Sequence, residues 1–245
     1  MTMDKKEILK ISTFNCRGLG ERNKRNTILS WLKRSYSGII FLQETHSTKA
    51  NEKYWNTIWK GNIEYCHGNS TARGVAILIS PSVDITINEI IRDNTGRFIL
   101  LDTNYNDQNL ILINIYAPTK DKTNLQKDFF QFVHKTVSEY ADKNIILGGD
   151  FNVCLNPNID KKGGSKESTS QSAELIQTIM EDLNLIDVWR CLNPNSLRFT
   201  RREMCRNGLV QSCLDYWLVS NHILYDFFKQ DIAPGLRSDH SIVYM

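Results

Sequence analysis

The sequence has no long hydrophobic run. None of its apolar stretches approaches the ~20 residues that cross a bilayer as a helix, and residues 1–10 are charged and lack the apolar core of a secretion signal. We therefore expect an intracellular protein that does not insert into membranes.

Cysteine is scarce and scattered. The six cysteines include no Cys-x-x-Cys pair, and Cys205 and Cys213 stand eight positions apart, whereas a disulfide framework or a zinc site needs tighter clusters. A Walker loop, a Gly-x-Gly-x-x-Gly segment after a strand and a serine nucleophile elbow are also missing. These absences favour neither redox chemistry, nor nucleotide-dependent chemistry, nor acyl transfer.

A strong excess of one charge is missing too. The net charge of +3, from 30 basic and 27 acidic residues, neither supports nor excludes nucleic-acid binding. The basic residues nevertheless gather in two places, and if folding unites them they form a phosphate-facing surface. Charge alone does not separate this surface from an ordinary solvated face. The clusters are Arg17, Arg22, Lys24 and Arg25, and Arg198, Arg201, Arg202 and Arg206.

Strand-like runs alternate with fewer helical patterns along the whole chain. The runs are rich in β-branched residues and almost continuously apolar, which is typical of strands covered on both faces, and the spacing within residues 75–116 favours antiparallel pairing. We predict one domain over residues 1–245 of the α/β class: a four-layer sandwich of two packed, mainly antiparallel sheets flanked by helices, rather than a doubly wound parallel sheet. Strands are predicted at 9–15, 38–42, 75–80, 83–91, 98–104, 110–116, 145–147, 214–219 and 241–244, and helices at 24–34, 125–140 and 172–183.

Polar side chains stand at the ends of several of these strands. One such residue is usually a turn residue, but six or more along the chain are better explained by one convergent site. Carboxylate and amide oxygens with a single histidine suit magnesium better than zinc, and such a site fits phosphoester hydrolysis. The residues are Asn15, Glu44, Asn114, Tyr116, Asp150, Asn152, Asp215, Asp239 and His240.

Six ordered segments resemble the endonuclease/exonuclease/phosphatase superfamily, which includes exonuclease III, apurinic endonucleases, pancreatic deoxyribonuclease and inositol polyphosphate 5-phosphatases. Further segments are similar to the apurinic-endonuclease-like endonuclease domain of LINE-type (non-LTR) retrotransposons. The superfamily segments are 14–18, 42–45, 114–118, 148–152, 214–216 and 238–240, and the retrotransposon-like ones are 183–190, 199–200 and 215–220.

This resemblance implies a role for each polar residue. Mg²⁺, for which Mn²⁺ can substitute, is expected on Glu44 and Asn15, with Asp239 on the same side. In the implied catalytic set, Asp150 positions and deprotonates the attacking water. His240 contacts the phosphate and is oriented by Asp215, and Asn152 and Tyr116 also bind the phosphate. Asp239 completes the set. Alternatively, Glu44 caps a helix or loop, and His240 is an ordinary histidine of the core. The predicted DNA-binding residues are Arg17, Asn114, Thr200, Arg201, Arg202, Arg206 and Ser212.

Residues 200–212 predict a β-hairpin, with Asn207-Gly208 as a type I′ turn signal. In the retrotransposon relatives the matching loop enters the minor groove and helps to choose the cut site. Its arginines here either read groove shape or hold phosphates, and an ordinary surface hairpin is the alternative.

The function implied is a DNA endonuclease that nicks one strand of double-stranded DNA and leaves a 3′-hydroxyl to prime reverse transcription. The resemblance further implies a nuclear protein with a reverse transcriptase domain in cis, this chain being the N-terminal part of a longer polyprotein. The alternative is an apurinic/apyrimidinic repair endonuclease. Those enzymes place Trp where Ser212 stands, so an abasic preference is doubtful. An inositol phosphatase and an inactive binding scaffold are further alternatives.

Overall fold

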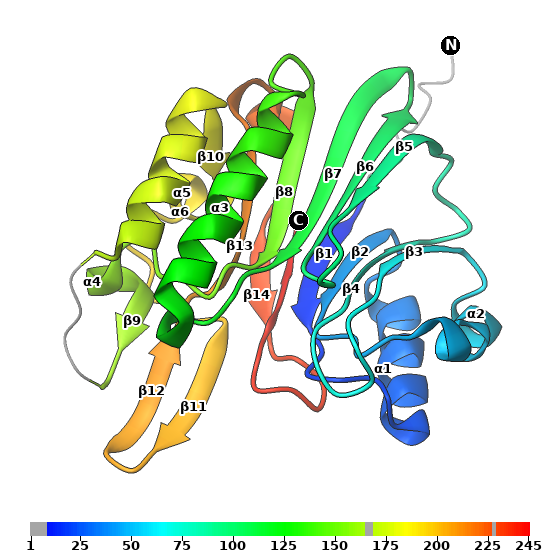
Figure 1. Ribbon diagram of the computed structural model, residues 1–245, viewed down its shortest axis with the longest axis horizontal. Helices are drawn as coiled ribbons and strands as arrows, with labels where there is room; N and C mark the ends of the chain where they lie inside the picture. The colour runs from blue at the N-terminus through cyan, green and yellow to red at the C-terminus, as the bar shows by residue number, and fades with distance from the viewer. Residues whose placement is uncertain (1–8, 165–168, 227–228) are drawn as a thin grey trace.

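Two six-stranded sheets form the centre of the computed structural model, which describes residues 9–164, 169–226 and 229–245. The first sheet contains β1 (Ile11–Asn15), β2 (Ile39–Gln43), β3 (Asn62–Cys66), β4 (Val75–Ile79), β14 (Asp231–Ala233) and β15 (Ile242–Tyr244). Its order is β14-β15-β1-β2-β4-β3 (Figure 1). The pair β1 and β2 is parallel, and the other neighbours are antiparallel.

The second sheet repeats this plan. It contains β5 (Thr86–Arg92), β6 (Phe98–Tyr105), β7 (Gln108–Tyr116), β8 (Asn144–Asp150), β10 (Leu185–Asp187) and β13 (Asp215–Ser220). Its order is β10-β13-β8-β7-β6-β5, and β7 with β8 is its parallel pair. Each sheet thus has a parallel pair at its centre, whose two strands end at the same edge.

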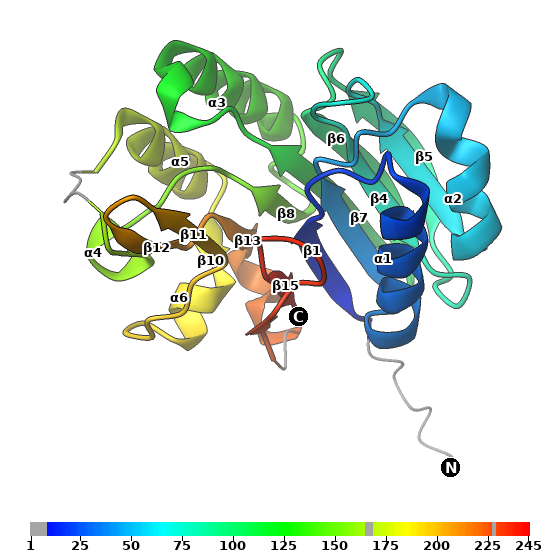
Figure 2. The same cartoon turned by 90° about the horizontal axis from the view of Figure 1, so that it is seen from below.

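Helices cover the outer faces of both sheets (Figures 1 and 2). Helices α1 (Arg22–Ser35) and α2 (Glu52–Trp59) pack on the first sheet, and α3 (Thr123–Ser138) and α5 (Gln171–Asp182) on the second. The predicted four-layer α/β sandwich is therefore confirmed. The remaining short helices are α4 (Pro157–Asp160), α6 (Val188–Leu192) and the 3₁₀ turns Lys49–Asn51, Lys120–Lys122 and Asn221–Asp226.

Alternation along the strands explains the continuous apolar runs. In β2, Ile39 and Phe41 pack between the sheets, while Ile40 and Leu42 pack under the helices. Because successive side chains point to opposite faces, a strand that is covered on both faces must be apolar at every position. The whole of β2 is buried, as the sequence predicted.

Some elements were not predicted. Helix α2 carries Trp55 and Trp59 four residues apart, both fully buried on one helical face, and this spacing was the available signal. The short strands β10 and β14 and the two-residue strand β9 (Lys161–Lys162) were also missed, because strands of two or three residues carry no detectable period. The five-residue edge strand β3 was missed as well, because most of its residues are only partly buried and it has no continuous apolar run.

One amide links the two sheets. Asn114, in β7, donates from Nδ2 to the carbonyl oxygens of Leu42 (3.0 Å) and Ala76 (2.9 Å), and its Oδ1 accepts from Gln43 Nε2 (2.7 Å). Asn114 has no exposed surface, so its predicted contact with DNA is wrong. Its amide satisfies polar groups between the sheets instead.

We expect Asn114→Ala to lower the free energy of unfolding by about 1–3 kcal/mol, because it leaves two carbonyls and one amide of the interior without their partner. Chemical denaturation measures this. Asn109→Ala, an exposed change in the same strand, should stay within about 0.5 kcal/mol of the wild type. Equal effects of the two substitutions would contradict the linking role.

Candidate active site

The central strands of both sheets end at one edge of the molecule. Asn15 ends β1, Glu44 follows β2, Tyr116 ends β7 and Asp150 ends β8. Viewed from below in Figure 2, β1, β8 and β13 lie side by side at the centre. The register pairs Asp215, the first residue of β13, with Asp150. The topology therefore delivers these polar side chains to one place.

Asp150, Asp215 and His240 form a buried cluster, with potential ligand atoms within 4.8 Å of one another. His240 Nδ1 lies 2.8 Å from Asp215 Oδ2 and 3.1 Å from Oδ1. His240 Nε2 lies 4.0 Å from Asp150 Oδ2. The imidazole is thus held by one carboxylate and turns its second nitrogen toward the other.

Burial and charge shift the pKa values of this cluster. Burial, followed by the charge of Asp215, raises the pKa of Asp150 to about 7, although His240 opposes the shift. Burial alone would lower the pKa of His240, but the charge of Asp215 and its hydrogen bond outweigh burial and raise it to about 9. Near neutral pH the imidazole is therefore cationic, while Asp150 exchanges a proton readily.

Asn15 connects this cluster to Glu44. Its Nδ2 donates to Glu44 Oε1 and to Asp150 Oδ2, each at 2.9 Å, and its Oδ1 accepts from the backbone N–H of Arg17 at 3.0 Å. The backbone N–H fixes the amide orientation, because a flipped amide would set two donors against each other. The metal ligation expected of Asn15 remains a prediction beside these hydrogen bonds. Asn15 orients the two carboxylates.

Tyr116 borders the same carboxylates and is held by Arg97. The Tyr116 hydroxyl hydrogen-bonds to Glu44, and burial, followed by the charges of Glu44 and Asp150, raises the pKa of Tyr116. Arg97 donates from Nη1 to the Tyr116 carbonyl at 2.9 Å, and its guanidinium carbon lies 4.8 Å from the ring centroid. The tyrosine therefore remains a hydroxyl donor. Sequence analysis missed Arg97, since a lone basic residue before a strand carries no signal.

The loops around the site adopt uncommon backbone conformations. Arg17, Glu44 and Asn152 have φ values of 48°, 50° and 53°, in the left-handed region. Non-glycine residues seldom adopt this region, and such residues cluster at functional sites. Asn152 donates from Nδ2 to the Ala117 carbonyl at 2.9 Å, and its backbone N–H donates to Asp150 Oδ1 at 3.0 Å. The loop thus holds Asp150 from its C-terminal side.

Close approach of β7 and β8 requires glycine just before Asp150. Gly149 has φ +138°, and a Cβ there would lie 2.1 Å from the Ile115 carbonyl oxygen. A Cβ on Gly148 would lie 2.2 Å from the Trp217 ring. The two glycines let the strands and the ring close in, which sets the position of Asp150.

Asp239 joins the two basic clusters. Its Oδ2 lies 3.3 Å from Arg17 Nη1 and 3.6 Å from Arg201 Nε. Its Oδ1 is buried and has no hydrogen-bond partner. Folding therefore unites an early and a late arginine at one carboxylate, as required for a shared basic surface, and leaves one oxygen of that carboxylate available.

Thr200 is fully buried, so its predicted contact with DNA is wrong. Its Oγ1 accepts from the backbone N–H groups of Leu214 (2.9 Å) and Asp215 (3.1 Å), and its carbonyl accepts from Ser241 N at 2.6 Å. Thr200 thus ties the segments that carry Asp215 and His240 together.

The predicted hairpin is present as β11 (Arg201–Cys205) and β12 (Gly208–Ser212). Cys205 pairs with Gly208, so Arg206 and Asn207 form the turn. The positive φ of 109° lies at Gly208, with neither turn residue in the left-handed region. The predicted type I′ turn at Asn207-Gly208 is therefore wrong, because the glycine follows the turn. Arg202 and Arg206 are exposed, while Arg201 and Ser212 are half-buried.

The oxygen donors of this edge fit a hard divalent cation. A protonated imidazole donates hydrogen bonds and does not ligate metal, so the cluster around His240 is a poor metal site. Glu44, half-buried beside Asp150, and the unpartnered Oδ1 of Asp239 offer the carboxylate oxygens that Mg²⁺ prefers.

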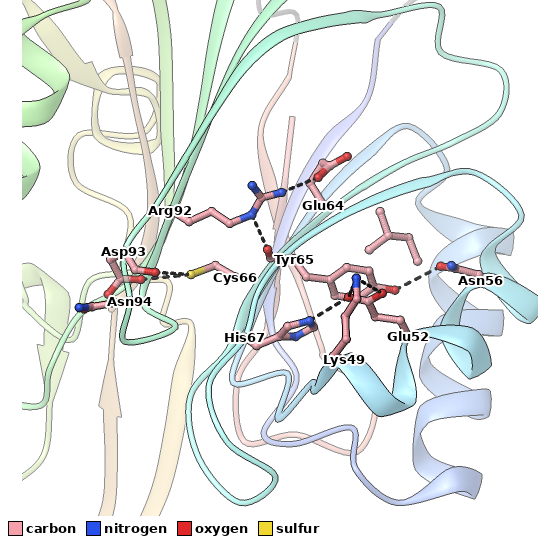
Figure 3. Close-up of a pocket in the computed structure, with 11 residues that line it drawn as sticks. Lys49, Glu52, Asn56, Glu64, Tyr65, Cys66, His67, Arg92, Asp93 and Asn94 are labelled. Carbon is pink, nitrogen blue, oxygen red and sulfur yellow. Dashed lines mark hydrogen bonds and ion pairs between the residues drawn. The ribbon is translucent and has the colours of Figure 1, made fainter.

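A separate hollow of about 440 Å³ lies at the edge strand β3. Figure 3 shows its charged side chains paired with one another: Arg92 with Glu64 (2.7 Å), and Glu52 with His67 (2.9 Å) and Lys49 (3.0 Å). The residues that line it include none of the predicted site residues.

The chain matches the Endonuclease/Exonuclease/phosphatase family over residues 12–240. It belongs to this family. Over 239 residues it is 30% identical to the Transposon TX1 uncharacterized 149 kDa protein of Xenopus laevis, a match that covers 96% of this chain and 18% of that protein. This chain thus spans less than a fifth of that relative. The predicted superfamily and its transposon likeness are confirmed, and membership of this family supports the predicted phosphodiester-hydrolase activity.

Solved structures show the same fold. An AP endonuclease from Archaeoglobus fulgidus superimposes with a TM-score of 0.74 at 20% identity, covering 96% of this chain and 98% of that one. The AP endonuclease LMAP from Leishmania major gives 0.80 at 18% identity, covering 99% and 88%. The catalytic domain of Xenopus laevis APE2 gives 0.77 at 19%, covering 96% and 90%. Among the described helices of this chain, none could span a membrane.

We expect Asp215→Asn to lower the pKa of His240 from about 9, because burial is then opposed only by the weaker charges of Asp150 and Asp239. NMR titration of the imidazole in metal-free protein measures this. Asp182→Asn removes an exposed carboxylate 3.0 Å from His134 and should leave His240 unchanged. A His240 that titrates alike in wild type and Asp215→Asn would contradict this electrostatic account.

Proposed function

We propose that the chain is a Mg²⁺-dependent DNA endonuclease that nicks one strand of double-stranded DNA, Mn²⁺ being able to replace Mg²⁺. The observation that carries this is the continuous polar network from Glu44 through Asn15 to Asp150, beside the Asp215–His240 pair. Such a site holds a hard cation, a base and a phosphate-binding cation side by side.

Each residue then has a distinct task. Asp150, with its pKa raised to about 7, accepts the proton of the attacking water. The His240 imidazolium, held by Asp215, donates Nε2–H to a phosphate oxygen, and Tyr116 donates its hydroxyl to the phosphate or the leaving oxygen.

Glu44 would hold the metal with help from Asp239, and the metal when bound offsets phosphate charge. Asn152 positions Asp150 through its backbone N–H, and its side chain would also bind a phosphate oxygen.

DNA would lie across the edge where the catalytic strands end. Arg17 and Arg201 meet there at Asp239, and the exposed Arg202 and Arg206 extend the basic surface along the hairpin. Ser212 stands at the root of the hairpin. These side chains would neutralise backbone phosphates and give salt-dependent affinity.

The biological setting is inferred from the transposon relative. We propose that residues 1–245 are the single endonuclease domain at the N-terminal part of a longer retrotransposon polyprotein, with reverse transcriptase in cis. The nick would leave a 3′-hydroxyl that primes reverse transcription at the target site, which requires action in the nucleus. A repair endonuclease for abasic DNA is the second candidate, favoured by the fold of the AP endonucleases.

We expect Asp150→Asn and His240→Gln each to reduce nicking of supercoiled plasmid by at least ~100-fold, as loss of an acid–base or charge-stabilising group does. Gel conversion of supercoiled to open-circular DNA measures this. The matched changes Asp142→Asn, at an exposed position, and His134→Gln should keep wild-type rates. A folded Asp150→Asn protein that nicks normally would refute the role of Asp150.

Chelation should abolish nicking, and added Mg²⁺ or Mn²⁺ should restore it, because Glu44 offers hard oxygen ligands. Glu44→Gln should need a higher Mg²⁺ concentration for half-maximal rate. Nicking that persists in excess chelator would overturn the metal requirement.

Duplexes with and without one abasic site distinguish the two candidates. The endonuclease proposal expects comparable nicking of both, since Ser212 provides no aromatic wall for an abasic pocket. Strong preference for the abasic duplex would favour the repair enzyme instead.

A further inference from the structure

A small three-stranded sheet projects from the main body beside the catalytic edge (Figure 1). Its central strand β12 pairs with β11 on one side and with β9 (Lys161–Lys162) on the other. We call β9, β11 and β12 the arm. The hairpin foreseen from the sequence is thus two thirds of a larger unit, whose third strand comes from a segment about forty residues earlier.

The strand β11, at one edge of the arm, is bonded to the segment that carries Asp239 and His240. Arg202 N donates to the Asp239 carbonyl at 3.1 Å, and Arg201 forms an isolated β-bridge with His240. The outer strand β9 adds the exposed Lys162 to the exposed Arg202 and Arg206. The arm therefore carries basic side chains on more than one strand and has a fixed attachment beside His240.

A single guanidinium bonds to the residue that precedes β9 and to a turn that leads toward β11. Arg190, in α6, donates from Nη2 (2.5 Å) and Nε (3.2 Å) to Asp160 Oδ1. Its Nη1 donates to the carbonyls of Ser196 (2.8 Å) and Asn193 (3.4 Å). Asp160 immediately precedes β9, and the Asn193–Ser196 turn leads toward β11. The side chains of the pair are 16% and 6% exposed.

Asp160 also fixes the other end of β12. Its carbonyl accepts from Cys213 N at 2.8 Å, and its Oδ2 accepts from Asn156 N at 2.8 Å. Asp160 thus ties the start of β9 and the end of β12 to Arg190, whereas β11 is attached at Asp239 and His240. None of the hydrogen-bond partners found for Arg190 in the described chain (Asp160, Asp187, Asn193, Ser196) belongs to the catalytic set.

A buried ion pair is weak evidence of net stability, because desolvation offsets its attraction, but it specifies geometry strictly. Arginine suits this task, since its planar fork binds several oxygens in fixed directions. Here those oxygens belong to the segments that enter β9 and β11. The pair therefore links the start of β9 to the turn that leads toward β11.

We propose that Arg190 and Asp160 are positioning residues that fix the direction of the arm, and that β9 makes the arm a three-stranded DNA-gripping surface. Together they determine which phosphodiester of a duplex reaches His240. This inference rests on the proposed DNA nicking. It assigns the choice of the cleaved phosphodiester to a buried ion pair that takes no part in the catalytic step.

Asp160→Asn tests the proposal, because it keeps the shape of the side chain and removes its charge. We expect nick sites on a defined duplex, mapped at nucleotide resolution, to spread to neighbouring phosphodiesters. KM for the duplex should rise about tenfold with kcat at saturation nearly unchanged, since the misplaced arm weakens binding and not the catalytic step. Arg190→Lys keeps the charge but loses the planar guanidinium, and it should produce the same changes in nick sites and KM. It serves as the test if Asp160→Asn does not fold.

Two further variants separate positioning from general damage. Glu64→Gln breaks the Arg92–Glu64 pair at the opposite side of the first sheet and should leave the cut map unchanged. With the arm shortened by replacing residues 203–210 with a glycine turn, Asp160→Asn should change the map no further, because effects acting through one element are not additive. An additional change in that background would overturn the proposal.

The outcomes also distinguish the two levels of inference. A wild-type protein that does not nick duplex DNA with Mg²⁺ refutes the proposed function. A wild type that nicks, with an unchanged map and KM in folded Asp160→Asn and Arg190→Lys proteins, refutes the positioning pair and leaves the proposed function standing.

Discussion

Two carboxylates and one imidazole share a nearly dry space where β8 and β13 pair, and their charges must balance there. Asp215 and His240 form the close ion pair, so Asp150 has no cation of its own at hydrogen-bond distance. Burial and the charge of Asp215 then raise the pKa of Asp150. The donors from Asn15 and Asn152 oppose this shift but leave it near neutrality. The chemistry proposed for the site thus follows from strand register and burial, which the glycines before Asp150 make possible.

The layered fold was predictable because burial on both strand faces leaves a strong mark in the sequence. Runs such as 39–42 and 110–113 allow only strands enclosed by other layers. The placement of polar residues at strand ends was predictable for the same reason, since a polar residue that interrupts such a run must leave the core or find partners. Elements with few residues in the core have no such apolar run in the sequence. β9 has two residues, and its pairing with β12 depends on contacts distant in the chain.

Assigning roles to individual polar residues was harder. The sequence shows which face of a strand a side chain occupies, but not how far that side chain lies from the open edge of the sheets. Asn114 and Tyr116 lie on the same face of β7, two residues apart. Tyr116 reaches the open edge, whereas Asn114 is one pleat deeper and covered by the first sheet. Thr200 likewise ends a recognisable segment yet bonds inward to Asp215. Arg97 contacts Tyr116 without belonging to any motif. Depth and contact partners are set by the packing of two sheets, which no local pattern encodes.

The two attachments of the arm explain how one scaffold can combine fixed chemistry with adaptable substrate choice. The catalytic residues are held by central strands whose register cannot slip, since a shift of one residue would turn every side chain to the opposite face. The arm is joined to that centre along β11, beside His240, and at its other edge strand through the Arg190–Asp160 pair. Under the proposed function, changes in the exposed residues or in the turn of the arm would therefore alter the surface offered to DNA without moving Asp150 or Asp215. Under the proposed positioning role, changes at Arg190 or Asp160 would alter the direction of that surface and so provide a second, independent means of shifting the site of cleavage.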